Sequence, residues 1–553
     1  MTMQQHLNSA NSVRRDAVLD EAHIGHIEGA LGTIRHGDVG PRKTWRARLG
    51  TLLAILGPGL IVMVGDNDAG AFSTYAQAGQ NYGYTLLWTL ILLIPVLYIN
   101  QEMVVRLGTV TGVGHARLIL ERFGKFWGAF SVIDLFLLNA LTIVTEFIGI
   151  DLGLRYLGLP TAPGVLVSAI IIMFAVSTGD FRRFERFALS LVGGTLIMLP
   201  MYLLVHPPLG EVIRHTIIPG LPQNAKLSDV MLLIIGIVGT TVAPWQLFFQ
   251  QSYVIDKRIT PRFMRYERID LAVGIVFVIV GAIAIIACTA YAFTQHPEFG
   301  NFADAGAVAA GMNKYVGRLP ATLFAVALII SSIIGAAAVS LATAYAVGDV
   351  LSLKHSLHRK PADAKGFYAI YFGLIIVAAA LVLSPNTPLG LLTSAVQTLA
   401  GVLLPSATVF LLLLCNDKAV LGPWVNGPKV NLFTGFIIAM LVMLSIILTA
   451  SVLFPQITAG QIKSILAGGS VMGLVTVIMT MLVKRKKGRE RATEAIDTSE
   501  RDTWRMPPLE QLEPKSMTFL NRIWMGVLRG YLVIAAGLVL VRITSLAFGG
   551  HGQ

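Results

Sequence analysis

The sequence predicts an all-α polytopic membrane protein. Of its 553 residues, 54% are hydrophobic and only 13% are charged, and a soluble protein of this length needs more charge on its surface. Apolar runs of about twenty residues recur along the chain, and each is long enough to cross a bilayer core of about 30 Å. Twelve spans are expected, at residues 51–76, 83–105, 127–153, 162–177, 188–206, 230–255, 270–295, 319–349, 366–384, 388–414, 432–454 and 463–483.

The distribution of basic residues predicts the topology. If the N-terminus is cytoplasmic, most Lys and Arg side chains fall in cytoplasmic loops, and the outer loops are nearly free of them. A miscount of one span would place basic loops on both sides. We therefore expect a multi-pass protein of the plasma or inner membrane. The cytoplasmic loops carry Arg106, Arg117, Arg122, Lys125, Arg182, Arg183, Arg186, Lys257, Arg258, Arg262, Arg265, Arg268, Lys354, Arg359, Lys360 and Lys365.

Charge and cysteine content narrow the choice of partners. The net charge of +12 follows from basic loops beside a lipid bilayer, so we infer no nucleic-acid partner. Cys288 and Cys415 both lie within apolar runs, so neither a disulfide framework nor a thiolate metal site is expected. No cofactor is predicted, and the sequence does not determine the oligomeric state.

Polarity divides the chain into five parts around a core of ten spans. The basic run from Lys484 to Arg491 follows the twelfth span and fits a cytoplasmic linker. The last apolar segment is expected to be either a thirteenth span or an interfacial helix. The parts are a polar cytoplasmic tail (1–50), the ten-helix core (51–415, with halves 51–206 and 230–415), two accessory spans (416–483), the basic linker (484–522) and the C-terminal hydrophobic segment (523–553).

The first span contains two carboxylates in an apolar setting. The segment GPGLIVMVGDNDAGAFST, residues 57–74, places Asp66 and Asp68 between Gly65 and Gly70. A charged group at mid-membrane costs about 2.5–3.5 kcal/mol on some scales, so it usually faces a partner or a cavity. Residues two apart on an unbroken helix point to nearly opposite sides, and glycine tolerates a break. The segment therefore predicts an interrupted helix whose carboxylates share one cavity with freed carbonyl groups.

The sixth span predicts a second interruption. The segment GIVGTTVAPWQLFFQQS, residues 236–252, places Pro244 inside a helix, which frees carbonyls near Thr240. Interrupted helices at matching positions of two five-helix sets indicate the binding site of a transporter. An ordinary proline kink and a structural carboxylate pair are the alternatives. Carboxylates, carbonyls and a side-chain amide suit a hard divalent cation, with Mg²⁺, Ca²⁺ and Mn²⁺ as candidates.

Three other functions compete with this one. An intramembrane metalloprotease needs a zinc motif such as H-E-x-x-H, and no span carries one, so no enzyme is expected. A transporter of an organic amine could use the same two carboxylates. A metal sensor could use His23, His26 and His36 of the N-terminal tail, although histidines in a polar tail are usually solvated.

Four segments resemble one family of membrane transporters. GPG followed by Asp68-Ala69-Gly70-Ala71 resembles the GPG…DPGN first helix of the NRAMP family of divalent-metal transporters. RLGTVTGVGHARLILERFG (106–124), TEFIGIDLGLRYLG (145–158) and APWQLFFQQS (243–252) are similar to later motifs of that family. The resemblance runs in matching order over residues 50–415. It implies the LeuT-type fold, with two inverted five-helix repeats, here followed by additional C-terminal helices.

The resemblance also implies a metal site. Asp68 takes the place of the family's metal-binding aspartate, and Gln397 that of a glutamine which joins the shell in some states. Gly65 and Thr240 would supply carbonyls from the two unwound helices. Several family residues are replaced: the metal-binding asparagine by Ala71, the methionine by Ala243, two sixth-helix histidines by Trp245 and Gln250, and a third-helix aspartate of the proton route by Ile143, while Glu146 remains.

These departures are closest to those of the NRAMP-related magnesium transporters. Loss of the thioether weakens selection for softer metals, and loss of imidazoles removes groups that titrate near neutral pH. We therefore expect Mg²⁺, ahead of Mn²⁺, to be transported by alternating access with weak or no proton coupling. The alternative is a proton-coupled Mn²⁺/Fe²⁺ importer of the ordinary type. The expected metal site is Asp66, Asp68, Gly65, Thr240, Ala243 and Gln397, and the expected gate or proton path is Trp245, Glu146 and Gln250.

Overall fold

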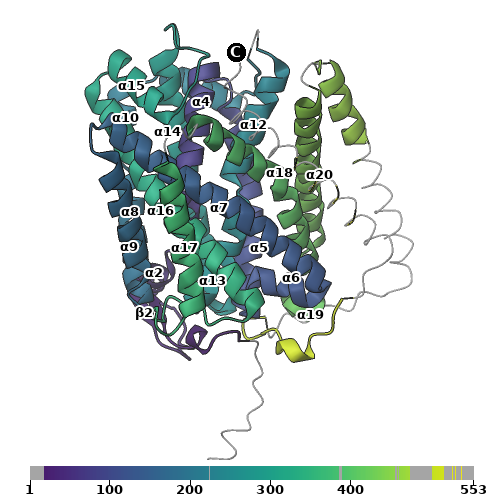
Figure 1. Ribbon diagram of the computed structural model, residues 1–553. Helices are drawn as coiled ribbons and strands as arrows, with labels where there is room; N and C mark the ends of the chain where they lie inside the picture. Colours follow the sequence, from purple (N-terminus) through teal and green to yellow (C-terminus); the bar gives the residue numbers. More distant parts are fainter. Residues whose placement is uncertain are drawn as a thin grey trace, which may run out of the picture.

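The computed structural model describes residues 18–222, 225–384, 389–454, 457–458, 460–471, 473 and 501–515, with isolated positions at 526, 530, 533 and 537. Within these ranges, nine helices are long and apolar enough to span a membrane. The bent pair α2 (Trp45–Ile55) and α3 (Pro58–Gly65) is long and apolar enough only when its two helices are taken together. The helices stand side by side in one bundle (Figure 1), so the prediction of an all-α polytopic protein is confirmed.

The remaining helices follow in chain order. They are α4 (Ala69–Tyr82), α5 (Trp88–Thr111), α6 (His115–Phe123), α7 (Lys125–Tyr156), α8 (Thr161–Val176), α9 (Phe181–Thr195), α10 (Met198–Val205), α11 (Leu209–Ile217), α12 (Leu227–Thr241), α13 (Pro244–Asp256), α14 (Met264–Phe293), α15 (Ala305–Tyr315), α16 (Arg318–Leu351), α17 (Lys365–Val382), α18 (Leu389–Cys415), α19 (Lys418–Leu421) and α20 (Pro428–Leu453).

The core consists of two sets of five spans that contact each other reciprocally. The first set begins with the broken helix α3–α4 and the second with the broken helix α12–α13. Both α3 and α4 pack on α14, the second span of the other set, and α13 packs on α5 in the same way. The third spans, α7 and α16, pack along each other. These matching contacts bring the two broken helices into the middle of the bundle.

Small residues allow the closest of these helix contacts. A Cβ atom added at Gly59 of α3 would lie 2.6 Å from the backbone nitrogen of Leu271 in α14. One added at Gly274 would lie 2.7 Å from the Gly59 carbonyl oxygen. Glycines at such crossings let helix backbones approach within a membrane, where packing drives association. The N-terminal half of the first broken helix is thereby held tightly against α14.

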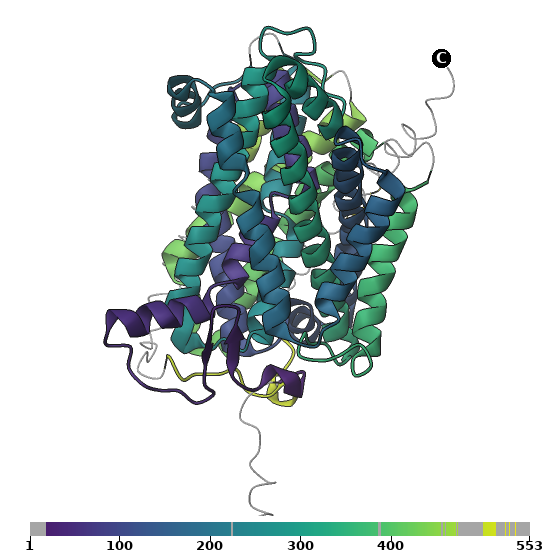
Figure 2. The same ribbon diagram turned by 90° about the vertical axis from the view of Figure 1, so that its left-hand side faces the viewer.

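The first span begins later than predicted. Helix α2 is a separate element, bent by 48° from α3, and it lies across one end of the bundle (Figure 2). The span itself consists of α3 and α4 and ends at Tyr82 rather than at residue 76. The sequence suggested one run because the end of α2 and α3 are both apolar, whereas the chain turns at Gly57, whose φ of 151° favours glycine, and Pro58 then begins α3.

The C-terminal predictions are covered only in part. Helix α20 corresponds to the predicted eleventh span. Much of the twelfth span, at 463–483, and nearly all of the segment 523–553 lie outside the described residues. Of the predicted linker, residues 501–515 follow the end of the bundle, where the Lys515 amide donates to the Arg122 carbonyl over 2.9 Å.

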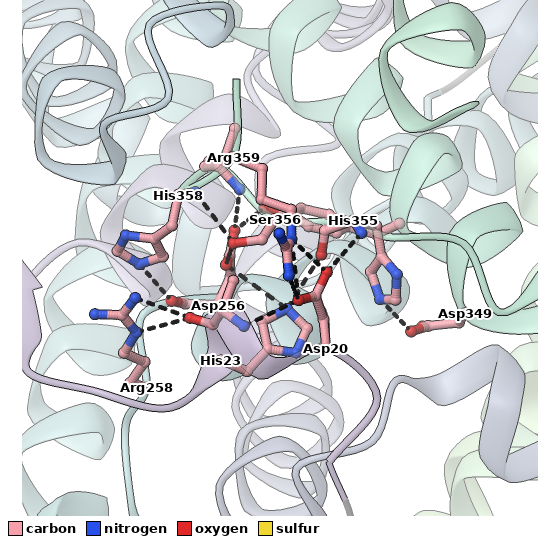
Figure 3. A network of polar contacts seen from close by, with 12 residues as sticks. Asp20, His23, Asp256, Arg258, Asp349, His355, Ser356, His358 and Arg359 are labelled. Atoms are coloured by element: carbon pink, nitrogen blue, oxygen red, sulfur yellow. Dashed lines mark hydrogen bonds and ion pairs between the residues drawn. The ribbon is translucent and has the colours of Figure 1, made fainter. Parts of the chain in front are cut away.

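Residues 18–50 of the predicted polar N-terminal tail have regular structure. They form a short 3₁₀ helix (Glu21–His23), an antiparallel hairpin of β1 (Ile27–Gly29) and β2 (Gly32–Ile34), and most of α2. Asp20 is only 4% exposed. Its carboxylate accepts hydrogen bonds from the Arg359 guanidinium (2.6 Å) and the His355 amide (3.0 Å), as Figure 3 shows. The segment is therefore attached to the loop between α16 and α17.

The three N-terminal histidines of the sensor hypothesis do not converge. His26 accepts a 2.8 Å hydrogen bond from the backbone amide of His36. His23 instead lies 3.7 Å from the Asp256 carboxylate, and its ring packs edge-on against that of His355. These distances describe a structural network in which His23 is largely buried, so the expectation that it is solvated is wrong.

The basic loops gather at the same end as the N-terminal segment. Arg258, after α13, donates to the carbonyl of Ala22 over 2.8 Å, and Arg262 donates to that of Gly40 over 2.7 Å. Together with Arg359, these contacts place two of the predicted cytoplasmic loops on the face that carries the N-terminal segment. The assignment of that face to the cytoplasm stays a prediction.

Candidate metal centre

Two helix breaks lie at the centre of the bundle. Helix α3 ends at Gly65, and α4 begins at Ala69 with Asp68 as its N-cap. Helix α12 ends at Thr241, and α13 begins at Pro244. Both interruptions occur where the sequence predicts them: Pro244 has no N–H for the helical ladder, and Gly65 and Gly70 make a departure from helical geometry less costly.

Each break removes the usual partner of one carbonyl group. The Thr240 carbonyl would normally accept from residue 244, but that residue is proline and has no N–H. The Gly65 carbonyl would normally accept from Ala69, whose amide instead donates to Glu146 Oε2 over 3.1 Å. Gly65 and Thr240 are therefore positions at which a break removes the usual backbone donor, and their role as metal ligands stays a prediction.

Asp68 is held at the start of α4. Its side chain is 2% exposed, and Oδ1 accepts the Ala71 amide at 2.8 Å, which satisfies an otherwise unpaired donor of the first turn. Its side chain lies beside that of Glu146 of α7, because a Cβ added at Gly335 would be 2.9 Å from Asp68 Cβ and 2.6 Å from Glu146 Oε2. The second oxygen of Glu146, Oε1, is buried without a partner in the described structure. Asp68 and Glu146 thus form one carboxyl pair at the positive end of a helix.

Asp66 has a different set of partners. It is fully buried, and Oδ1 accepts a hydrogen bond from the amide of Gln246. Gln246 in turn accepts a 2.9 Å hydrogen bond from Gln101 of α5. The other oxygen, Oδ2, has no partner among the described residues. An unpaired buried carboxylate oxygen is costly, and a bound cation would remove that cost.

Gln246 and Gln101 are the residues that sequence reasoning missed. Gln246 lies two positions after Pro244, so its closeness to a predicted break was a usable signal. Gln101 carried no local signal, because its role depends on the packing of α13 against α5. Asn67, although it stands between the two aspartates, turns away and donates to the Val278 carbonyl of α14 over 3.1 Å.

The other predicted residues lie at different distances from the breaks. Gln397 of α18 packs on Gly70, where an added Cβ would be 1.7 Å from its amide nitrogen. Trp245 packs beside Gly65, with its ring 3.7 Å from where a Cβ would lie. Ala243 is buried between α12 and α13. Gln250 is buried six residues beyond Pro244, roughly 9 Å along α13, so it belongs to the helix and not to the break.

Several side-chain polar atoms near the two breaks are buried without a hydrogen-bond partner. Among the described residues, these atoms are Asp66 Oδ2, Glu146 Oε1, Thr240 Oγ1, Trp245 Nε1 and Gln397 Nε2; further along α13, the amide atoms of Gln250 are also buried without a partner. No group of three or more His, Cys, Asp or Glu side chains in the described ranges is arranged as a metal site. The available donors are instead two carboxylates, amide groups and backbone carbonyls, a set that suits hard cations such as Mg²⁺, Ca²⁺ and Mn²⁺.

Comparison with known proteins gives the same family as the motifs. Residues 59–451 match the family model described as natural resistance-associated macrophage protein-like. The divalent metal cation transporter MntH of Latilactobacillus sakei is 27% identical over 457 residues, which cover 79% of this chain and 97% of that protein. MntH of Ralstonia nicotianae is 28% identical over 392 residues, covering 68% and 86%.

The fold is also found among solved structures. The manganese transporter of Eremococcus coleocola, crystallised with an aromatic bis-isothiourea compound, aligns with a TM-score of 0.59 at 20% identity, over 85% of this chain and 100% of that one. A variant of the same transporter, in which one histidine is replaced by alanine, aligns with a TM-score of 0.58 at 19% identity, over 83% and 98%. These alignments confirm the LeuT-type fold. The family match covers most of the chain, and the protein therefore belongs to the natural resistance-associated macrophage protein-like (Nramp) family.

Proposed function

We propose that this chain carries a divalent metal cation across the membrane by alternating access, with the ion held between the breaks of α3–α4 and α12–α13. The observation that carries the proposal is the pair of freed carbonyls, at Gly65 and Thr240, beside the buried carboxylates of Asp66 and Asp68. The relatives are transporters of divalent metal cations, not enzymes. Asp66, Asp68, Gly65, Thr240 and Gln397 are the proposed ligands.

The relatives favour Mn²⁺ as the transported ion. The solved structures are of a manganese transporter, and an oxygen-rich site accepts Mn²⁺ as readily as Mg²⁺. A specific observation keeps Mg²⁺ as the second candidate. Ala243 has no sulfur, and it is buried at the α12–α13 break where the resemblance expects a methionine. Without a soft ligand, we expect the site to discriminate poorly between Mn²⁺ and Mg²⁺.

Proton coupling depends on the carboxyl pair of Asp68 and Glu146. Two carboxyl groups that lie side by side in a buried setting favour sharing one proton, because two like charges at close range repel each other. A divalent cation at Asp68 favours the ionised form of that group and would displace the proton. Coupling through Glu146 is therefore retained in this proposal, and the replacement of the family's histidines by Trp245 and Gln250 does not remove it.

Influx into liposomes tests the proposal. The purified full chain is reconstituted, and Mn²⁺ and Mg²⁺ influx are followed beside an internal pH dye, with Asp68→Asn as the inactive control. Mn²⁺ influx with acidification supports a coupled manganese transporter, and similar influx of both ions supports weak discrimination. Mg²⁺ influx without acidification would contradict proton coupling and would indicate an uncoupled magnesium pathway. Influx of neither ion, in protein that is folded, would contradict the proposed function.

A further inference from the structure

A basic cavity lies between α2 and the start of α14, far from the metal centre. Its volume is about 310 Å³. Three arginines, Arg42, Arg48 and Arg265, line it together with Trp45 and Tyr266, and none of the lining residues is acidic. Helix α2, which supplies several of the lining residues, lies across one end of the bundle (Figure 2).

Two of the three arginines form no ion pair with an acidic side chain in the described ranges. Arg42 is neutralised by Asp38, with Nη2 2.8 Å from Oδ2. Arg48 uses only its Nε, which donates to the Arg42 carbonyl. Neither Arg48 nor Arg265 pairs with an acidic side chain in the described ranges, and both are exposed. Guanidinium groups gathered without counter-charges are suited to phosphate.

An apolar path leads from this cavity along α14 into the membrane zone. Ile269, which lines the cavity, begins a row of exposed side chains that continues through Val273, Val276 and Val280. The spacing of three or four residues places them on one helix face. Val276 and Val280 line a second cavity of about 160 Å³ between α14 and the α9–α10 pair, roughly 10 Å further along the helix.

We propose that this surface binds an anionic phospholipid. Arg48 and Arg265 hold the phosphate of the headgroup, and one acyl chain follows the α14 row from Ile269 to the second cavity. Trp45, which is 73% exposed at the mouth, has the amphipathic ring that favours the membrane–water boundary. Basic pockets beside the ends of transmembrane helices are a known means of selecting anionic headgroups. A free phosphate would use the arginines but would leave the apolar path empty.

Lipid retention tests the assignment. The full chain is extracted from membranes of phosphatidylcholine and phosphatidylglycerol, and bound lipids are counted by native mass spectrometry. We expect phosphatidylglycerol to be enriched, and R265Q or R48Q to lower its retention about fivefold. R46Q is the matched control, because Arg46 is an exposed arginine of α2 that does not line the cavity; it should change retention little.

Several outcomes would overturn the proposal. Equal losses in R46Q and R265Q would indicate general surface charge, and equal retention of phosphatidylcholine would indicate an apolar groove without headgroup selection. Complete displacement of phosphatidylglycerol by inorganic phosphate would assign the arginines to a free anion. If R265Q does not fold, the tryptophan fluorescence of the wild-type chain is measured with brominated phosphatidylglycerol as the quencher and W45F as the blank. Equal quenching in the two proteins would contradict a lipid at Trp45.

Discussion

Two buried polar regions of this protein are built in opposite ways. At the metal centre, Asp66 and Glu146 each keep one carboxylate oxygen without a described partner. In the N-terminal network (Asp20, His23, Asp256, His355, Ser356 and Arg359), both oxygens of Asp256 are satisfied: Tyr345 Oη (2.6 Å), the Leu357 amide (2.8 Å) and Ser356 donate to them. Asp20 likewise accepts from Arg359, His355 and Ala22.

This difference in hydrogen bonding indicates that one region serves ligand binding and the other serves the stability of the fold. A buried carboxylate with all of its hydrogen bonds made has nothing left to offer a ligand, and it stabilises the contacts around it. A buried carboxylate with an open oxygen destabilises the fold unless something binds there. The comparison predicts that substitutions at the metal centre reduce transport at little cost in stability, and that substitutions in the N-terminal network do the reverse.

The largest effect is expected for Asp68→Ala. Mutation of a residue that only supports a metal ligand usually lowers metal affinity about 10–100-fold. Removal of Asp68, a proposed ligand, should lower the affinity by more than that and abolish uptake. Asp68→Asn is the sharper variant, because asparagine keeps the N-cap hydrogen bond to Ala71. Uptake is measured in liposomes and the unfolding midpoint by thermal denaturation; a normal rate in the Asn variant would refute the site.

The converse effect is expected for Asp256→Ala. The change leaves the donors of Tyr345, Ser356 and Leu357 without an acceptor, so the free energy of unfolding should fall by about 3 kcal/mol or more. Metal affinity, measured by calorimetry on the folded fraction, should stay unchanged. An equal fall in affinity would mean that the two regions are coupled and that the comparison fails.

A smaller effect on binding is expected for Asp66→Asn. Asparagine at this position still accepts the Gln246 hydrogen bond but lacks the negative charge, so divalent affinity should fall about tenfold, or roughly 1.4 kcal/mol. Titration calorimetry with Mn²⁺ and Mg²⁺ measures it. Unchanged affinity would mean that Asp66 serves only as a structural hydrogen-bond acceptor for Gln246, as Asp256 does for its own donors.

The N-terminal network should respond to pH through His355. Burial lowers the pKa of His355, but the hydrogen bond (2.9 Å) and charge of Asp349 outweigh burial and raise it to about 9. Because the folded pKa lies above the unfolded value of 6.5, this contribution to stability is complete below pH 6.5 and is lost as pH rises through 9. Asp20 works in the other direction: burial raises its pKa, but Arg359, the Ala22 amide and the charge of His23 bring it to about 2.

The unfolding midpoint measured against pH checks this expectation. The wild-type value should fall between pH 6.5 and 9, and His355→Gln should flatten the curve. His206→Asn is the control, since His206 is exposed and asparagine tolerates its left-handed backbone. A wild-type slope that survives in His355→Gln would assign the pH response to another group.

The smallest effect is expected for Ala243→Met. A thioether at the α12–α13 break adds a soft ligand and should shift the preference towards Mn²⁺ by a few-fold without changing the fold. Ala243→Leu adds a similar volume without sulfur. Competition between the two ions in uptake assays gives the ratio, and an equal shift in both variants would show that size, not sulfur, sets the preference.

The membrane class, the two helix breaks and the family can all be predicted from the amino-acid sequence. These features are local: an apolar run, a proline without an N–H and a carboxylate pair beside glycine are each visible in a few neighbouring residues. The freed oxygen of Thr240 follows from the same local chemistry, because Pro244 has no N–H to donate. The alternation of basic loops is a property of the chain's order and needs no tertiary contact.

Only the tertiary structure decided which polar groups meet. Gln246 reaches Asp66 across 180 positions of sequence, and the Ala69 amide reaches Glu146 across 77. Asn67 turns to α14 although it lies between two proposed ligands. The N-terminal segment, polar in composition, is tied to loops more than 200 residues away. Such pairings depend on how helices pack, because a polar side chain in a buried setting takes whichever partner the packing places within reach.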